Sequence, residues 1–467
     1  MRLSDATVAH LPTTVARPFY DRDAQAVGIV HFGIGAFHRA HQAWYTDAAM
    51  NAGAGEQHGR DWAILGISLR SGDVAAQLNP QDGLYTLVER SAAAPVARIV
   101  GAVRDVLVAS AQSGAAIAAL AAPTTHIASL TITEKGYGRA ADGSLDPALA
   151  GDGSIYPLLA AGLRRREAAG LPGLTLLSCD NLADNGRQLD RLLREYLAAH
   201  DPALVEWFER ECTCPATMID RIVPATTEAD RTAVHDLLGG LDDRACVVTE
   251  PFAQWVIEDR FAGPRPRWEA VGAQLVGDVA AYELAKLRML NGAHSLLAYG
   301  GLLRGHALVH EAVADPVLRA LAARLMLAEA APTLTPAPGQ DLRGYAEALL
   351  ARFANPALDH KLIQIAMDGS QKLPQRWLET LAASQRAGRR CPAILTALAA
   401  WLRHVRGDNS AIWGIVDDPR AAELAAAWHR TGEAGIVEAV FGERGLLRSP
   451  WRPDDADRAT IAAALAA

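Results

Sequence analysis

The segment VGIVHFGIGAFHRAHQAW, residues 27–44, constrains the fold of this chain more than any other stretch. An apolar, β-branched run ends at Phe32, two glycines follow, and a helix-compatible stretch begins. Strand, glycine turn and helix in this order are the setting of a dinucleotide-binding turn, because glycines let the backbone approach a pyrophosphate at the helix N-terminus. The predicted cofactor contacts are Gly33, Ile34, Gly35, Ala36 and Phe37. His38 replaces the third glycine of the usual pattern, so a plain βα turn is the alternative.

The residues after the next predicted strand, 62–68, bear on the choice of cofactor. An acidic side chain there favours NAD, whereas a basic one accepts the 2′-phosphate of NADP. Arg70 follows the strand closely and Asp73 comes late. We predict NAD, with NADP left open.

Three further apolar runs, 126–134, 173–181 and 245–252, end in polar residues. Buried parallel strands have this form, with functional groups at their carboxyl ends. Glu134 and Lys135 are therefore predicted to lie near the cofactor, and an ion pair between them is the alternative. A helical stretch at 187–199 alternates with these strands, so the first part of the chain is predicted to be α/β.

The character of the chain changes after residue 284, where alanine, leucine and arginine dominate and β-branched runs vanish. The periodicity predicts helices over 281–303, 316–331, 341–353, 375–387, 391–405 and 419–430. We expect two domains, a dinucleotide-binding α/β domain over 1–284 and a mainly α-helical substrate-binding domain over 285–467.

Composition bears on several other classes of protein. The 467 residues are half hydrophobic, and a net charge of −8 without a long basic run argues against a nucleic-acid partner. No secretory signal and no long apolar stretch are present, so no membrane partner is expected. Five irregularly spaced cysteines do not make a disulfide framework. We expect a cytoplasmic monomer or small homo-oligomer.

Histidines near the glycine turn and one cysteine raise two further possibilities. His31, His38 and His41 lack the spacing of metal ligands on a helix face, so no metal site is expected. Cys179, at a predicted strand end, is either a nucleophile or a small buried side chain, and we favour the second.

The stretch KLRMLNGAH, residues 286–294, places polar groups ahead of the apolar run SLLAYGG. On an α-helix, with about 100° per residue, Glu283, Lys286, Asn291 and His294 share one side. Such a stripe suits a cleft at a domain junction. The alternative is an ordinary ion pair between Glu283 and Lys286, followed by a turn at Asn291.

Seven ordered segments resemble the polyol-specific long-chain dehydrogenases, the family of mannitol 2-dehydrogenase and fructuronate reductase. They are GIGAFHRAHQA, TITEKGY, SCDNLADNG, DRIVPATT, EPFAQWVIED, KLRMLNGAHS and IAMDGSQKLPQR. The resemblance implies a Rossmann-type α/β N-terminal domain and a helical C-terminal domain, with substrate held between them. It also implies NAD(P) and no catalytic metal.

The resemblance assigns roles to individual residues. It implies Lys286 as the catalytic acid/base, Asn181 and Asn291 as oxyanion donors, His294 as substrate-orienting, Glu283 as a proton relay, and Lys372 as a substrate contact. Residues 352–376 look more like the fructuronate reductase branch, whose uronate substrate needs a cation for its carboxylate. Lys372 and Arg376 are the candidates, and a solvated helix start is the alternative.

The expected activity is the NAD(P)-dependent interconversion of a secondary alcohol and a ketone. We expect D-mannonate/D-fructuronate, with D-mannitol/D-fructose or another polyol as the alternative. An epimerase that uses the nicotinamide transiently and a non-enzymatic NAD-binding sugar sensor are further alternatives. An amine that takes the hydroxyl proton and carboxamides that meet the developing alkoxide make chemical sense together.

Overall fold

The computed structural model describes residues 1–53, 61–408 and 410–466, and the chain divides into two compact units. The first unit is Met1–Val279 and the second is Ala280–Ala467. The sequence places the boundary after residue 284, which lies inside helix α10 (Ala280–Ala285). The division in the structure falls just before that helix.

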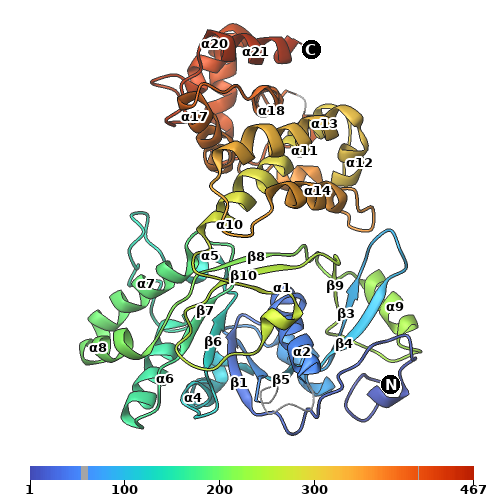
Figure 1. The fold of residues 1–467 in the computed structure, drawn as a ribbon, viewed down its shortest axis with the longest axis vertical. Coiled ribbons are helices and arrows are strands. Elements are labelled where there is room, and N and C mark those ends of the chain that lie inside the picture. The colour runs from blue at the N-terminus through green and yellow to red at the C-terminus, as the bar shows by residue number, and fades with distance from the viewer. Residues whose placement is uncertain (54–60, 409, 467) are drawn as a thin grey trace. The chain divides into compact units, whose positions relative to one another are not determined.

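A parallel five-stranded sheet forms the centre of the first unit (Figure 1), with strand order β5–β2–β1–β6–β7. The strands are β1 (Val27–Phe32), β2 (Ala63–Ser68), β5 (Val103–Val108), β6 (Ile127–Leu130) and β7 (Thr175–Ser178). The order reverses between β1 and β6, as it does in dinucleotide-binding sheets. The predicted Rossmann-type α/β class is confirmed.

Helices cover both faces of this sheet. Helices α4 (Ala109–Leu120), α6 (Tyr156–Ala168) and α7 (Asn185–His200) share one apolar core with Val30 and Phe32 of β1. Helix α2 (Gln42–Ala52) shares a second core with Ile29 of the same strand. Successive side chains of a strand point to opposite faces, so one strand supplies both cores.

Two small sheets complete the first unit. One has the order β11–β10–β8 and the other β4–β3–β9. Their strands are β8 (Thr217–Asp220), β10 (Gln254–Glu258), β11 (Gln274–Val276), β3 (Tyr85–Glu89), β4 (Val96–Val100) and β9 (Val247–Thr249). The predicted strand 245–252 is β9, which pairs in parallel with β3 and does not join the main sheet. A short apolar run carries no information about its partner strand.

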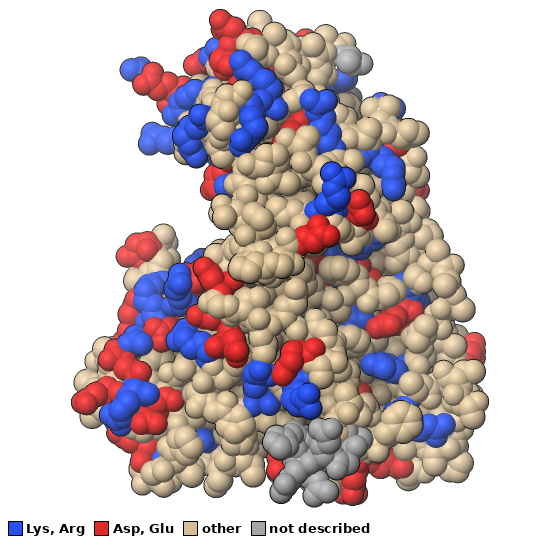
Figure 2. Space-filling model, viewed as in Figure 1, with Lys and Arg blue, Asp and Glu red and all other residues tan. Residues whose placement is uncertain are grey.

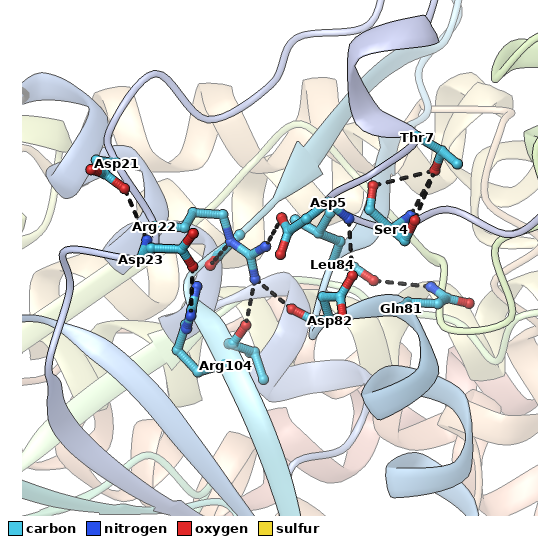
Figure 3. Close-up of polar contacts among 12 residues, drawn as sticks. Ser4, Asp5, Thr7, Asp21, Arg22, Asp23, Gln81, Asp82, Leu84 and Arg104 are labelled. Atoms are coloured by element: carbon cyan, nitrogen blue, oxygen red, sulfur yellow. Dashed lines mark hydrogen bonds and ion pairs between the residues drawn. The ribbon is translucent and has the colours of Figure 1, made fainter.

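An arginine ties the N-terminal segment to the first unit (Figure 3). Nε of Arg22 donates to the Gly101 carbonyl at 3.0 Å and Nη2 donates to the Val103 carbonyl at 3.2 Å. Nη1 forms an ion pair with Asp5, whose backbone N–H donates to the Asp82 carboxylate at 3.0 Å. These contacts hold the segment ahead of β1 against the start of β5.

The second unit is built from helices around α11 (Gly292–Leu303), in which residues 292–302 are all buried. The longer helices are α13 (Pro316–Arg324), α14 (Leu342–Phe353), α17 (Glu379–Arg386), α18 (Pro392–Val405), α20 (Ala421–Phe441) and α21 (Asp455–Ala466). The shorter ones are α12 (Val309–Ala314), α15 (Leu362–Ile365), α16 (Gly369–Leu373) and α19 (Ser410–Trp413). All six predicted helical segments are helical.

Three π-helical segments interrupt these helices and correct one prediction. They are η5 (Lys286–Asn291), η6 (Leu325–Ala330) and η8 (Pro374–Leu378), and η5 packs against the other two. The regular α-helix assumed over 281–303 would place Asn291 about 140° around the axis from Lys286. Hydrogen bonds in a π-helix run from i to i+5, so Asn291 lies about one turn above Lys286.

The charged surface, the helices and the cysteines bear on the same classes of protein as the composition does. Figure 2 shows basic and acidic side chains interspersed over the face in view. Within the described ranges, no helix combines the length and the hydropathy that crossing a bilayer requires. All five cysteines are buried and free.

Candidate active site

The glycine turn follows β1 at the point where the strand order reverses. Ligands of open α/β sheets bind outside the carboxyl ends of strands at such a point. Gly33 has a φ of +88°, and a Cβ atom there would lie 2.1 Å from the carbonyl oxygen of Thr131, just after β6. Only glycine fits this position, because a side chain would meet both backbone strain and a clash.

The same turn presents unused backbone donors. Gly35 is the N-cap of α1 (Ala36–Ala40), and a Cβ atom on it would meet only the Gly33 carbonyl oxygen, at 3.8 Å. In the described part of the chain, the backbone N–H groups of Ala36 and Phe37 have no acceptor. An open turn with free N–H groups fits a pyrophosphate. The Ile34 side chain is buried against Gly66, so only its backbone is available to a cofactor.

His38, which replaces the third glycine, lies inside the unit. Its ring stacks on that of His31 with centroids 3.4 Å apart. Both nitrogens of His31 are engaged by hydroxyl groups, those of Ser129 and Thr131. Among the described residues, no group of three or more histidine, cysteine, aspartate or glutamate side chains is arranged to hold a metal ion.

Of the two residues after β2 that bear on the cofactor, Asp73 is hydrogen-bonded and Arg70 forms no ion pair with a described residue. Asp73 begins α3 (Asp73–Leu78), and its carboxylate accepts a hydrogen bond of 2.6 Å from the Ser71 hydroxyl. Arg70 is exposed and forms no ion pair with any described residue. An exposed cation after β2 can bind the 2′-phosphate of NADP. The carboxylate of Asp73 is already hydrogen-bonded at the start of α3.

A buried carboxylate at the end of β7 holds the loop after β6. Asp180 accepts hydrogen bonds from the backbone N–H groups of Ile132, at 3.1 Å, and Thr133, at 2.8 Å. It also accepts one from the Tyr137 hydroxyl at 2.8 Å. Thr133 has a φ of +64°, which a side chain rarely adopts, so these bonds keep it in a strained conformation. Burial raises the pKa of Asp180, and the nearby Glu134 raises it further.

This loop carries the two residues predicted to lie near the cofactor. Glu134 and Lys135 belong to the short helix α5 (Thr133–Gly136), and both are exposed. Within the described ranges they do not pair with each other. The sequence analysis missed Asp180, although an acidic residue directly before Asn181 at a strand end was a visible signal. Neighbouring Cys179 is buried and burial raises the pKa of its thiol, which fits a small packed side chain.

In the second unit, basic groups surround His294 on α11. His294 is buried, with the Phe353 ring at 4.6 Å and the His360 ring at 5.3 Å between centroids. Burial lowers the pKa of His294, and so do His360, Arg352, Arg376 and Lys286. The imidazole is therefore neutral and offers one donor and one acceptor.

Arg376 lies beside His294 without an acidic partner. Its Nη1 donates to the hydroxyl of Ser295 at 2.8 Å, and no carboxylate of a described residue pairs with it. Burial lowers its pKa to about 10. A guanidinium is costly to bury without an anion, so the position suits a ligand that supplies one.

Lys372, the other predicted cation, is tied to the two residues that precede its own helix, α16. Its Nζ donates to the Met367 carbonyl at 2.7 Å and lies 3.5 Å from the carboxylate of Asp368. Burial lowers its pKa, and the charge of Arg376 acts in the same direction. Of the two predicted cations, Arg376 is the one that lacks a counter-ion in the described part of the chain.

The other predicted catalytic residues are distributed over both units. Lys286 and Asn291 begin and end the π-helical segment η5, and Glu283 lies on the preceding α10. The second unit thus brings Lys286, Arg352, His360 and Arg376 together around His294. Asn181 follows β7 in the first unit.

Comparison with known families identifies both units. Residues 27–270 match the model of the mannitol dehydrogenase Rossmann domain, and residues 278–446 match the mannitol dehydrogenase C-terminal domain. The chain belongs to the mannitol dehydrogenase family. It is therefore an oxidoreductase, and the predicted family, fold class and enzyme class are confirmed.

The relatives of this chain within the mannitol dehydrogenase family have several names. This chain is 45% identical to the oxidoreductase YdfI of Escherichia coli, over 91% of this chain and 90% of that protein. It is 40% identical to the D-mannonate oxidoreductase of E. coli, over 97% and 95%. The solved ternary complex of Pseudomonas fluorescens mannitol 2-dehydrogenase with NAD and D-mannitol is 35% identical, with a TM-score of 0.81 over 100% and 96%.

We expect Asp180→Ala to release the loop that contains α5. The variant leaves the N–H groups of Ile132 and Thr133 without their charged acceptor, which contributes about 1.5–3 kcal/mol per bond. Hydrogen–deuterium exchange of residues 132–137 should accelerate about tenfold or more.

Asp243→Ala is the matched control for this variant. Asp243 is equally buried and also accepts two backbone N–H groups, from Thr86 and Ala245, in another part of the unit. It should leave exchange at 132–137 unchanged. Equal exchange of this segment in wild type and Asp180→Ala would show that the carboxylate does not hold the loop.

Proposed function

We propose that this protein is an NAD-dependent reductase of a keto sugar acid, which interconverts D-fructuronate and D-mannonate. The observation that carries the proposal is the partly buried guanidinium of Arg376, which has no carboxylate partner among the described residues. A uronate supplies that carboxylate, and a planar guanidinium can bind it through two parallel hydrogen bonds. Mannitol and fructose carry no acidic group and cannot neutralise the charge.

Two comparisons support this proposal. The D-mannonate oxidoreductase of E. coli is similar over almost the whole chain. The solved mannitol 2-dehydrogenase holds NAD, which supports NAD as the cofactor of the Rossmann unit here. The turn residues Gly33, Ile34, Gly35, Ala36 and Phe37 would hold the pyrophosphate, with Glu134 and Lys135 nearby.

The proposed chemistry divides the work between cofactor and protein. The reduced nicotinamide supplies the hydride that reaches the keto carbon. The ammonium of Lys286 donates the proton that the carbonyl oxygen takes up, and in oxidation the neutral amine removes it from the hydroxyl. The carboxamides of Asn291 and Asn181 stabilise the oxyanion without a net charge. Glu283 passes the proton between Lys286 and water.

His294 and Arg376 orient the substrate in this proposal. Neutral His294 donates one hydrogen bond and accepts another, which suits the hydroxyl groups of a sugar acid. Arg376 holds the carboxylate, and Lys372 contributes a second positive charge from the same segment. The mannitol-type activity is the alternative, which the substrate panel below distinguishes.

Arg376→Gln should separate acidic from neutral substrates. Loss of a charged hydrogen-bonded partner costs about 2–3 kcal/mol, so the KM for D-fructuronate should rise roughly 30–160-fold. Any slow turnover of D-fructose should change much less. The measurement is NADH oxidation by absorbance with each ketone.

Lys372→Gln is the matched control, because Lys372 already has Asp368 beside it. We expect a smaller rise in the KM for D-fructuronate from this variant. Wild-type oxidation of NADH with D-fructose and none with D-fructuronate would contradict the uronate assignment and favour the mannitol activity.

Lys286→Ala should abolish proton transfer while leaving the nucleotide site intact. A positioned acid/base contributes about 10²–10⁴-fold to turnover, so kcat should fall by that factor while the Kd for NADH stays near wild type. Lys361→Ala, at an exposed position, is the control and should retain full turnover. Near wild-type kcat in Lys286→Ala would refute the assigned role.

Arg70→Gln should sharpen the preference for NADH. The exposed guanidinium of Arg70 is the cation nearest in sequence to the end of β2 and would attract a 2′-phosphate. We expect the KM for NADPH to rise about tenfold, the cost of one charged contact, with little change for NADH. An unchanged ratio of kcat/KM for the two cofactors would remove Arg70 from the explanation.

A further inference from the structure

A row of buried polar side chains leads from α2 to the glycine turn. The Oε1 atom of Gln42 lies 2.8 Å from the Ser129 hydroxyl, and that hydroxyl lies 2.8 Å from Nδ1 of His31. Nε2 of His31 lies 2.9 Å from the Thr131 hydroxyl, which donates to the Gly33 carbonyl oxygen at 2.7 Å. All five residues belong to the first unit, on β1, β6, α2 and the loops that follow the two strands.

These side chains occupy positions that face an apolar core. His31 and Ser129 are paired across β1 and β6, and both follow the alternation of Ile29 and Ile127. Gln42, Ser129 and His31 have no exposed surface. Most buried polar groups have at least one hydrogen-bond partner, because leaving a donor or acceptor unsatisfied costs free energy.

Counting protons shows which group donates and which accepts in each hydrogen bond of the row. The Gly33 carbonyl can only accept, so the single Thr131 proton goes to it and Nε2 of His31 must donate to Thr131. A neutral imidazole then accepts at Nδ1, so the Ser129 proton goes to His31. The Ser129 oxygen must in turn accept a proton, and only the amide nitrogen of Gln42 can donate it.

This assignment of donors therefore requires the amide nitrogen of Gln42, and not its oxygen, to face Ser129. Carboxamide oxygen and nitrogen are nearly alike in shape, and hydrogen-bond networks distinguish them. With the oxygen toward Ser129, Nε2 of Gln42 has no partner in the described part of the chain. With the nitrogen there, that donor is satisfied. The opposite orientation would need a fully buried imidazolium, whereas burial lowers the pKa of His31 to about 3.

The row ends at the Gly33 carbonyl, on the residue whose conformation only glycine can adopt in this turn. The Gly33 carbonyl accepts both from Thr131 and from the backbone N–H of Gly35, at 2.6 Å. Two donors fix the direction of this carbonyl at a residue whose φ is positive. The free N–H groups of Ala36 and Phe37 follow directly after it.

We propose that His31 is a positioning residue for the cofactor: Gln42, Ser129, His31 and Thr131 form a one-directional hydrogen-bond chain that locks the Gly33 carbonyl and so sets the turn that binds the dinucleotide. This inference rests on the proposed cofactor role of the turn. It gives His31, Ser129 and Thr131 an effect on nucleotide affinity without contact to the substrate.

The test compares Thr131→Val with Thr131→Ser in the full-length protein. Valine removes the last hydroxyl of the chain, and serine keeps it. NADH titration by fluorescence should show a Kd about tenfold higher for Thr131→Val, the effect of one buried hydrogen bond, and a Kd near wild type for Thr131→Ser. In steady-state kinetics the KM for NADH should rise, while the KM for the ketone stays unchanged.

Thr175→Val is the matched control for a lost buried hydroxyl. Thr175 begins β7 and pairs with Ile127 at the amino end of β6, away from the carboxyl ends of the strands, and its hydroxyl accepts from the N–H of Ala262 at 3.0 Å. It should lower Tm without changing the Kd for NADH. If Thr131→Val likewise lowers Tm but leaves the Kd for NADH unchanged, the hydrogen-bond chain has a structural role only. The proposal is then overturned. If wild type does not bind NADH, both this inference and the proposed function fail.

Histidine NMR tests the direction of the chain independently. With ¹³C-labelled histidine, assigned through His31→Asn, the His31 signal should show the Nε2–H tautomer and no titration between about pH 5 and 8. Gln42→Glu removes the amide donor, so Ser129 must donate to the carboxylate and His31 should bind a proton in that range. Titration of His31 in wild type, or none in Gln42→Glu, would overturn the assigned direction.

Discussion

The close approach of two strand ends at Gly33 is the constraint on which the first unit depends. The residue that follows β1 lies so near the backbone after β6 that no side chain fits between them. This contact closes the sheet at the point where the strand order reverses, which is where a dinucleotide is accommodated. The row from Gln42 to Thr131 and the Asp180 carboxylate act on the two segments that meet there. Both devices are polar groups buried in a core that is otherwise apolar.

The second unit has a different electrostatic character. Around His294 the neighbours that shift its pKa are all basic, and every one of them lowers it. Of these basic neighbours, Arg376 has no carboxylate partner among the described residues, and an anionic ligand would neutralise its charge. The proposal of a keto acid rests on this guanidinium. A neutral polyol would leave the guanidinium of Arg376 uncompensated.

Much of the fold was predictable because local patterns carry it. The β1 strand, the glycine turn and α1 follow from one segment, and the six helical segments follow from periodicity. Strand partners did not follow: β9 joins a small sheet although its sequence resembles that of a main-sheet strand. The π-helical segment η5, which packs against η6 and η8, was also beyond prediction, because the periodicity argument assumes a regular α-helix. That change moves Asn291 relative to Lys286.

By itself, the sequence determined the family and the α/β class, and it named the polar residues that the proposed chemistry uses. Those properties depend on residue types in order along the chain, which motifs record directly. Only the tertiary structure decided which of two predicted cations lacks a carboxylate partner among the described residues, since Lys372 and Arg376 differ in their neighbours and not in their charge. It also decided that His31 and Gln42 belong to one chain ending at Gly33. Hydrogen bonds join residues far apart in sequence, so their geometry exists only once the strands are paired.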